Sequence, residues 1–399
     1  MIGGADVRIT LVACGSRGDV QPMMALALGL RDAGHDVLLC APPEFETWVT
    51  SCSCPYHPLG AGFRNNPAMA RASLRAFGRF IKQELTTEIR ELPDVVRGSA
   101  LVLATGLVYG VPTVAEFLRI PYRLVAFCPA TTLGTSRDPL SIRLGGWLMR
   151  LALNAGYRRA VNRERSAIGL PPVRDVLRNW GGDRPIAATD AALTYVPEGA
   201  TLNAVQTGYM HLRESGAMSP ELEAFLDSGP PPVYVGFGSA PAVDPEKLGR
   251  LLAEVARSLQ LRLVIARGWS RLDALAGGTG CLVVDDVPHP QLFPRVAAVV
   301  HHGGAGTVAT AARAGVPQVV LPVMSDQFQW QSQVVKLGLG PPAGILRFVS
   351  AKKLSGAISE CLSNPRYRER AREVSRALQG TNGVELTVKV VEQQLAATR

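Results

Sequence analysis

The chain has 399 residues, of which 47% are hydrophobic and 19% charged; this composition excludes an intrinsically disordered protein, and the length suits two domains. Lysine and arginine number 42 against 33 acidic residues, a net charge of +9. Because the excess is divided almost evenly between residues 1–212 and 213–399, with no basic arm or tail, it does not indicate nucleic-acid binding.

The first half of the chain begins with alternating strand and helix patterns. The apolar run 7–13 predicts a strand, the Gly-rich stretch 14–21 a turn, and the stretch from Pro22 to about Asp32 a helix. Residues 36–41 predict the next strand, and such a βαβ start implies a parallel sheet. Further short apolar runs predict strands at 100–104, 122–127 and 192–196, with an Arg-rich helix at 140–169.

A polar, Pro-rich seam separates the two halves. Residues 213–232 end in Gly229-Pro230-Pro231-Pro232, a composition typical of an interdomain linker. The pattern then restarts, and strands are predicted at 233–237, 261–266, 281–284, 297–301 and 318–321, with helices between them. We therefore predict an α/β protein with an N-terminal domain at 1–212, a linker at 213–232, a second domain at 233–380 and a terminal segment at 381–399.

Cysteines and targeting signals bear on the compartment. The seven cysteines form no C-x-x-C pair, which disfavours a disulfide framework or a zinc ribbon. The start of the chain lacks the basic region of a signal peptide, and the longest early uncharged run, 98–115, is interrupted by glycine and proline. We expect a cytoplasmic protein with reduced thiols and no stable membrane insertion.

The strongest local signal is a Gly-rich loop between a strand and a helix. Residues 299–307 run V-V-H-H-G-G-A-G-T, with a helix expected at 308–314. Free amides at a helix start and the helix dipole favour an anion such as phosphate, and histidine adds a donor. The loop lacks the G-K-[ST] ending of a P-loop, and a tight structural turn is the alternative.

Three further loops follow predicted strands. Residues 235–240 form a second Gly turn that suits the same phosphates, or an ordinary turn. Asp326 and Gln327 follow the strand at 318–321 and suit sugar hydroxyls, or Asp326 caps a helix. Asp19 lies on the predicted loop after the first strand, where it is either a general base or a helix cap.

Six segments together resemble the family 1 glycosyltransferases of the GT-B fold, above all the bacterial natural-product branch and the sterol glucosyltransferases. They are G-S-R-G-D-V-Q-P at 15–22, V-Q-T-G-Y at 205–209, Y-V-G-F-G-S at 234–239, D-V-P-H at 286–289, H-H-G-G-A-G-T at 301–307 and D-Q-F-x-W at 326–330. They occur in the family's order and span nearly the whole chain. The resemblance implies two Rossmann-like domains facing across a cleft, with the acceptor on the first and the nucleotide sugar on the second.

The resemblance also implies roles for single residues. Asp19 is expected to be the catalytic base, and Val287 to contact the nucleobase through its backbone. Asp326 and Gln327 are expected to bind sugar hydroxyls, and 386–395 to form a helix crossing back to the first domain. The donor diphosphate is expected to be held by Ser239, His302, Gly304, Ala305, Gly306 and Thr307.

These roles imply an inverting transfer. Asp19 takes the proton of the acceptor hydroxyl as its oxygen attacks the anomeric carbon, while loop amides and His302 stabilise the leaving diphosphate. Because no D-x-D motif is present and Asp285 and Asp286 are adjacent, pointing in different directions on a strand end, we expect no metal. We also expect no cofactor besides the donor substrate.

The donor and the acceptor are less closely defined. The intact Asp326-Gln327 pair favours UDP-glucose. In plant members an acid eight positions after the loop histidine contacts the ribose, and that position here is Thr310, so a dTDP-deoxysugar donor stays open. Apolar residues in 55–90 and 130–185 suggest a hydrophobic small-molecule acceptor such as a polyketide, macrolide, terpenoid or sterol: Met69, Phe77, Phe80, Leu144, Trp147 and Met149.

Three other functions fit parts of the sequence. A GT-B sugar-nucleotide epimerase needs several acid/base carboxylates, and only Asp19 and Asp326 are candidates. A binding protein with a decayed site is expected to lack Asp19, His302 or the Asp326-Gln327 pair, and all are present. A peripheral enzyme with a lipid acceptor would use a basic amphipathic helix, for which a solvated face is the alternative: Arg64, Arg71, Arg75, Arg79 and Lys82, with Leu74, Phe77 and Phe80.

Overall fold

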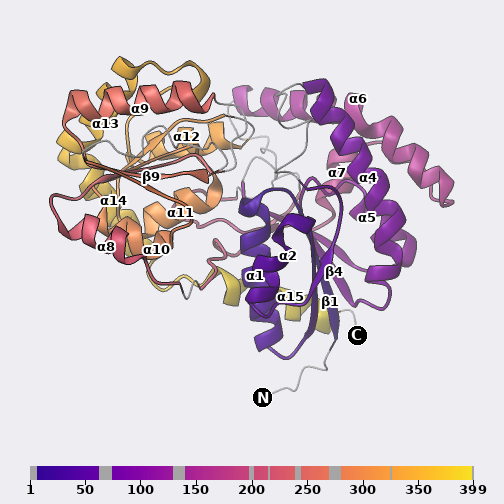
Figure 1. Ribbon diagram of the computed structural model, residues 1–399. Helices are drawn as coiled ribbons and strands as arrows, with labels where there is room; N and C mark the ends of the chain where they lie inside the picture. The colour runs from indigo at the N-terminus through magenta and orange to yellow at the C-terminus, as the bar shows by residue number, and fades with distance from the viewer. Residues whose placement is uncertain are drawn as a thin grey trace. The chain divides into compact units, whose positions relative to one another are not determined.

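The computed structural model describes residues 7–62, 74–128, 140–196, 202–213, 216–238, 244–268, 280–323 and 326–397. The chain forms two compact units: residues 1–212 with 382–399 make the first, and residues 213–381 make the second. Each unit is built on one parallel sheet with helices packed on it (Figure 1). The predicted α/β fold class is confirmed.

The first unit contains a seven-stranded sheet in the order β3-β2-β1-β4-β5-β6-β7. All neighbouring strands are parallel. The strand order reverses between β1 and β4, and open α/β sheets bind ligands beyond the carboxyl ends of the strands at such a point. The strands are β1 (Arg8–Cys14), β2 (Asp36–Ala41), β3 (Tyr56–Pro58), β4 (Leu101–Gly106), β5 (Tyr122–Ala126), β6 (Ile186–Ala187) and β7 (Val205–Gln206).

Helices of the first unit come from both ends of the chain. The last helix packs against the first: a side chain at Gly29 of α1 would lie 2.4 Å from Val384 of α15. Thr387 of α15 donates a hydrogen bond to Thr207 at 2.9 Å, which ties the end of the chain to the segment after β7. The helices are α1 (Arg17–Asp32), α2 (Glu46–Ser51), α4 (Leu74–Val96), α5 (Val111–Leu118), α6 (Leu140–Ala167), α7 (Val176–Gly181) and α15 (Gly383–Ala397).

Helix α1 begins earlier than the sequence predicts. It starts at Arg17, so Asp19 lies in its first turn and Pro22 inside it. The start is fixed by a capping box: Asp19 accepts from the Ser16 backbone N–H, and the Ser16 hydroxyl accepts from the Gly18 N–H. Two reciprocal side-chain bonds satisfy amides that no helical turn can reach, and they outweigh the usual preference of proline for the first position.

The predicted strand at 192–196 is wrong. Residues 191–193 form a turn, and the Gln206 carboxamide bonds this segment: it donates to the Thr189 and Thr194 carbonyls at 2.8 and 2.7 Å and accepts from the Val196 N–H at 3.2 Å. A side chain therefore satisfies backbone groups that a neighbouring strand would otherwise bond. The edge of the sheet is formed instead by the two-residue strands β6 and β7, which are too short to leave an apolar pattern.

The second unit contains a five-stranded parallel sheet in the order β10-β9-β8-β11-β12. Its strand order reverses between β8 and β11. The strands are β8 (Val233–Gly236), β9 (Leu263–Ala266), β10 (Cys281–Val284), β11 (Ala298–His301) and β12 (Gln318–Val320). The helices are α8 (Pro220–Asp227), α9 (Pro245–Leu259), α10 (His289–Leu292), α11 (Ala305–Arg313), α12 (Gln327–Lys336), α13 (Ala351–Ser363) and α14 (Pro365–Leu378).

Both faces of this second sheet are buried. Val233 and Val235 of β8 pack on one face with α9 and α13, whereas Tyr234 between them packs on the other with α8 and α10. A strand with both faces covered has no polar side, so it forms a short, continuously apolar run. This explains why the strands of the second half, including 281–284, are well predicted from the sequence.

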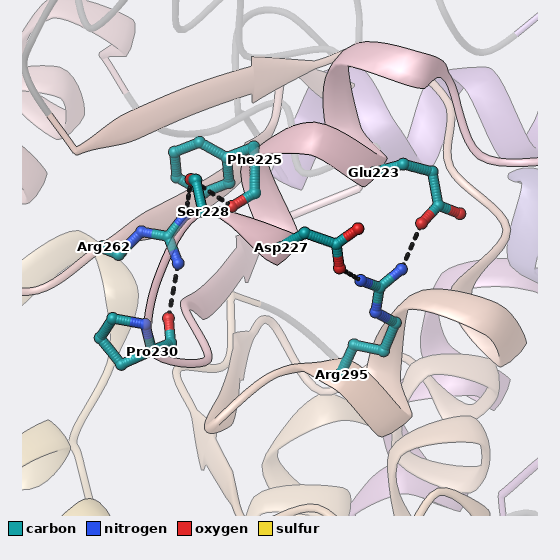
Figure 2. A network of polar contacts seen from close by, with 7 residues as sticks. All are labelled: Glu223, Phe225, Asp227, Ser228, Pro230, Arg262 and Arg295. Atoms are coloured by element: carbon teal, nitrogen blue, oxygen red, sulfur yellow. Dashed lines mark hydrogen bonds and ion pairs between the residues drawn. The ribbon is translucent and has the colours of Figure 1, made fainter.

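Helix α8 lies within the segment expected to be a linker. Its Leu222 and Leu226 are buried in the core of the second unit, and two arginines fasten it there (Figure 2). Arg295 pairs with Glu223 and Asp227. Arg262 donates to the carbonyls of Phe225 and Pro230 and to Ser228, with its guanidinium 4.3 Å from the centre of the Phe225 ring. Residues 220–227 therefore belong to a folded unit.

The described part of the basic amphipathic segment is α4. Phe80 and Ile81 are 3% and 2% exposed, so the apolar side of the helix packs into the core of the first unit. Its basic residues Arg75, Arg79 and Lys82 are exposed. This favours a solvated basic face. Of the residues expected to line an acceptor site, Phe80 is therefore a core residue, Trp147 is 57% exposed, and Met69 lies outside the described residues.

Candidate active site

The loop from β11 to α11 is organised by a buried histidine. His301 ends β11 and is fully buried. Its Nδ1 accepts from the Gly303 N–H at 3.1 Å, so its Nε2 carries the proton and donates to Gln318 Oε1 at 3.0 Å. Burial lowers the pKa of His301 to about 3, so the ring is neutral. His301 therefore shapes the loop and faces no ligand.

His302 presents the second imidazole of this loop. Its ring packs between two glycines: a Cβ at Gly238 would lie 3.0 Å from its Cε1, and a Cβ at Gly304 would lie 2.6 Å from its Nε2. Burial lowers the pKa of His302 to about 4, so the ring is neutral at neutral pH. A hydrogen bond with the Gly236 backbone acts on this pKa in the opposite direction. The two glycines and this bond hold the ring at the start of the loop.

The start of α11 supplies backbone donors beside His302. Gly304 is the N-cap residue, and no side chain caps this helix. The amides of Ala305, Gly306 and Thr307 occupy the first three helical positions, where an intrahelical acceptor is lacking, and the helix dipole adds partial positive charge. Gly303 has a φ of +92°, which only glycine adopts readily. The arrangement suits a phosphate group.

Val287, which is predicted to contact the nucleobase, lies at the same edge of the second sheet. Val287 follows β10 and is partly buried on the core. The next turn is anchored by His289, whose Nε2 lies 2.7 Å from the Tyr234 hydroxyl and whose ring stacks on Phe293 at 4.5 Å. This anchor fixes the backbone around Val287. Ser239 lies outside the described residues.

Asp326 and Gln327 lie where β12 leads into α12. Asp326 occupies the N-cap position without a regular capping hydrogen bond, although its carboxylate interacts with the backbone N–H groups of Asp326 and Gln327. Burial raises its pKa to about 6. Gln327 Oε1 accepts from the Val323 N–H at 2.8 Å, so this side chain also closes its own loop. The sequence did not predict that second role.

Asp19 lies at the corresponding edge of the first sheet. Its Oδ2 accepts from the Ser16 N–H at 2.8 Å and lies 3.3 Å from the Ser16 hydroxyl. A Cβ at Gly15 would lie 2.1 Å from Oδ2 and one at Gly106 3.5 Å from Oδ1, so glycines leave room for the carboxylate. Both contacts from Ser16 engage the same oxygen, Oδ2.

The sequence interpretation missed three buried groups at the carboxyl end of β1: Cys14, Glu84 and Glu88. Cys14 ends β1, and its thiol lies 3.7 Å from Glu84 Oε2. Glu88 accepts from the Gly110 N–H at 2.6 Å. The available signal was the position of Glu84 and Glu88 on the same helical face as the apolar Ile81, Leu85 and Leu92, where a charged residue is unusual.

The described residues contain neither a metal-ligand cluster nor a membrane-spanning helix. No group of three or more His, Cys, Asp or Glu side chains there is arranged to hold a metal ion. None of the helices described is both long and apolar enough to cross a membrane.

The fold defines a class: a protein of two Rossmann-like units, the second of which has a Gly-rich helix start suited to an anion. Residues 9–134 match the glycosyltransferase family 28 N-terminal domain, and residues 250–391 match the erythromycin biosynthesis protein CIII-like C-terminal domain. The chain is 39% identical to the vancomycin aglycone glucosyltransferase of Amycolatopsis orientalis over 84% of this chain and 85% of that protein. It is 28% identical to the sterol 3-beta-glucosyltransferase UGT80B1 of Arabidopsis thaliana, over 98% and 68%.

Solved structures agree on the fold. The glycosyltransferase of kitacinnamycin superposes with a TM-score of 0.78 at 21% identity, covering 98% of this chain and all of that one. The calicheamicin glycosyltransferase CalG4 superposes with a TM-score of 0.74 at 17% identity, over 99% and 100%. The chain belongs to the GT-B glycosyltransferases, in the branch that contains the antibiotic and sterol glycosyltransferases.

Proposed function

We propose that the protein is an inverting glycosyltransferase that moves glucose from UDP-glucose to a hydroxyl of a hydrophobic natural product. The assignment of a nucleotide-sugar donor rests on the cradle formed by His302 and the start of α11. It combines a neutral imidazole with three amides at a helix start. Such a site binds a diphosphate through donors and the helix dipole, so the proposed donor contact requires no positively charged side chain.

Asp19 is the proposed base. An alcohol is a far weaker acid than a protonated aspartate, so the carboxylate takes the proton in the transition state as the acceptor oxygen attacks. The oxygen bonds to the anomeric carbon, the bond to the diphosphate breaks, and the diphosphate leaves from the opposite face. Inversion follows from this single displacement. The capping bond from Ser16 holds Asp19 in one rotamer, which reduces the entropy lost on the way to the transition state.

The proposed cradle stabilises the leaving group. Negative charge grows on the diphosphate as its bond to the sugar breaks, and the Ala305, Gly306 and Thr307 amides together with His302 are already oriented for it. Donors fixed before the reaction need no reorganisation and stabilise charge more than water does. The His301–Gln318 bond keeps the loop in this shape.

The sugar is assigned to Asp326 and Gln327. The Asp326 carboxylate interacts with two backbone N–H groups, and a carboxylate has further acceptor sites that suit sugar hydroxyls. This favours a fully hydroxylated sugar. The vancomycin aglycone glucosyltransferase, a relative at 39% identity, supports glucose. A dTDP-sugar donor is the second candidate, because the dTDP-epi-vancosaminyltransferase of Amycolatopsis orientalis is 34% identical over 92% of this chain.

A competition assay tests the donor and the acceptor together. The protein is incubated with equal UDP-glucose and dTDP-deoxysugar and a panel of glycopeptide aglycones, macrolides and sterols, and products are read by mass spectrometry. A hexose addition is the expected result, and preferential deoxysugar addition contradicts the glucose assignment. Asp326→Ala should lower kcat/KM for UDP-glucose about tenfold or more, because a charged hydrogen bond is lost. A new epimer from UDP-glucose alone would instead identify an epimerase.

A further inference from the structure

Two buried glutamates of α4 lie under the carboxyl end of β1. Glu84 and Glu88 are one helical turn apart and are 2% and 1% exposed. Buried acids without a cationic partner are rare because removing a carboxylate from water is costly. The proposed transfer uses neither, so their presence in the core of the first unit requires an explanation.

Glu84 uses both of its oxygens as acceptors. Oε1 accepts from the Ala61 N–H at 3.1 Å, and Oε2 accepts from the Cys14 thiol at 3.7 Å. A Cβ at Gly60 would lie 2.1 Å from Oε2, so the carboxylate lies directly on the backbone of this turn. Burial raises the pKa of Glu84, and the hydrogen bonds from Ala61 and Cys14 act against this shift. A carboxyl with a donor on each oxygen suits the ionised form, which accepts only.

Glu88 contacts the start of α5. Its Oε2 accepts from the Gly110 N–H at 2.6 Å, and the carboxyl also interacts with the Val111 N–H, whereas Oε1 is buried and makes no hydrogen bond of regular geometry among the described residues. A negative charge there would lack solvation on one side and would face a like charge one turn away. Burial raises the pKa of Glu88 well above its ordinary range, and the Glu84 charge adds to this effect. The pair therefore suits one proton and one charge.

Cys14 connects the pair to Asp19. A Cβ at Gly106 would lie 2.0 Å from the Cys14 carbonyl oxygen and 3.5 Å from Asp19 Oδ1, so the carboxylate and the end of β1 meet at Gly106. The pKa of the Cys14 thiol is raised by burial first and then by the charges of Glu88, Glu84 and Asp19. All three carboxyls thus act on one buried thiol, which stays neutral.

The other titratable groups near these acids are mostly neutral aromatics. Tyr209 faces Asp19 and Asp190, and burial raises its pKa; the His211 ring lies 4.9 Å from it. Tyr109 and Tyr122 face Glu88, and burial raises their pKa values as well. On α1 itself, Arg17 lies 4.6 Å above the Trp48 ring. The α4 groups that act on the Cys14 thiol together with Asp19 are the two buried glutamates, Glu84 and Glu88.

We propose that Glu84 and Glu88 share one negative charge, carried by Glu84, and that this charge strengthens Asp19 as a base. Glu84 is then a positioning residue that acts through electrostatics, and the neutral Glu88 holds the start of α5. The inference rests on the proposed role of Asp19. A nearby like charge makes Asp19 hold a proton more tightly, and a stronger base removes the acceptor proton more effectively.

Three isosteric variants of α4 test the proposal. Glu84→Gln removes the proposed charge. Glu88→Gln replaces the proposed neutral acid with a neutral amide of the same shape, and Glu91→Gln removes an exposed charge from the same helix. In Glu84→Gln the acidic limb of the kcat/KM profile should move down by about 0.5–1 pH unit, and the plateau should fall about 2- to 10-fold. The limbs of Glu88→Gln and Glu91→Gln should stay where the wild-type limb lies. Equal limbs in all four proteins would overturn the proposal.

An infrared measurement tests the shared charge without turnover. The wild-type protein should show the carbonyl band of one protonated buried carboxyl at neutral pH, absent in Glu88→Gln and retained in Glu84→Gln. Two such bands in the wild type, or none, contradict the shared charge even if Glu84→Gln does not fold. Asp19→Asn separates the two hypotheses: wild-type turnover in that variant removes Asp19 as base, whereas an inactive variant with an unshifted Glu84→Gln profile refutes only the inference.

Discussion

The carboxyl edges of the two sheets are built from opposite chemical groups. The edge of the second unit offers glycines, helix-start amides and a neutral imidazole around His302. The edge of the first unit gathers Asp19, Glu84 and Glu88 around Cys14. Both edges lie where the strand order reverses, so the same topology supports two kinds of chemistry. The difference teaches that the sheet determines where a site forms, and the loop residues determine whether it takes an anion or a proton.

The largest effect is expected from a substitution of Asp19 at the carboxyl edge of the first sheet. Asp19→Asn should lower turnover about 10²- to 10⁴-fold, because a general base contributes that much, and the amide cannot take the proton. Donor affinity, measured by calorimetry with UDP, should change little, since the cradle belongs to the other unit. Turnover at the wild-type level would show that Asp19 is not the base.

The next largest effect is expected from substitutions of His302 and Gly304 at the carboxyl edge of the second sheet. His302→Ala should lower kcat about 10- to 10³-fold and weaken UDP binding, because one preorganised donor to the diphosphate is lost. Gly304→Ala should act in the same direction, since its Cβ would lie 2.6 Å from His302 Nε2. Steady-state kinetics with varied donor measures both. Unchanged UDP affinity in both variants would move the diphosphate site elsewhere.

A smaller effect concerns stability and pH. The pKa of His301 is lowered by burial to about 3, whereas the unfolded value is about 6.5. The unfolded chain therefore binds more protons between these values, and the free energy of unfolding should fall by about 2 kcal/mol from pH 7 to pH 5 through this residue. His301→Gln should flatten that part of the dependence in thermal melts. An identical pH dependence in the two proteins would argue against a buried neutral His301.

The last prediction is that removing divalent metal ions does not change turnover. If amides and His302 neutralise the leaving diphosphate, excess EDTA should leave turnover unchanged, because the proposed mechanism assigns no step to a metal. The control is the same assay with Mg²⁺ or Mn²⁺ added back. Activity lost with EDTA and restored by either ion would assign the diphosphate partly to a metal.

The sequence predicted those parts of the fold in which local pattern and tertiary burial agree. Strands such as 36–41 and 281–284 are apolar on both sides, so their runs are continuous, and their predicted bounds match the structure. The prediction failed at 192–196, where the Gln206 side chain bonds the backbone in place of a strand. It also failed at α8, where polar residues and prolines concealed a helix anchored by Arg262 and Arg295.

The sequence alone determined the α/β class, the Gly-rich loop at 301–307 and the positions of the motifs, because these depend on short-range spacing. Only the tertiary structure decided that His301, the last residue of β11, is a buried loop organiser and that His302, the next residue, packs against Gly238 and Gly304. It also brought Glu84 and Glu88 to Cys14, across 70 residues of chain in the case of Glu84. Contacts between distant residues arise from how helices pack on a sheet, which no local pattern records.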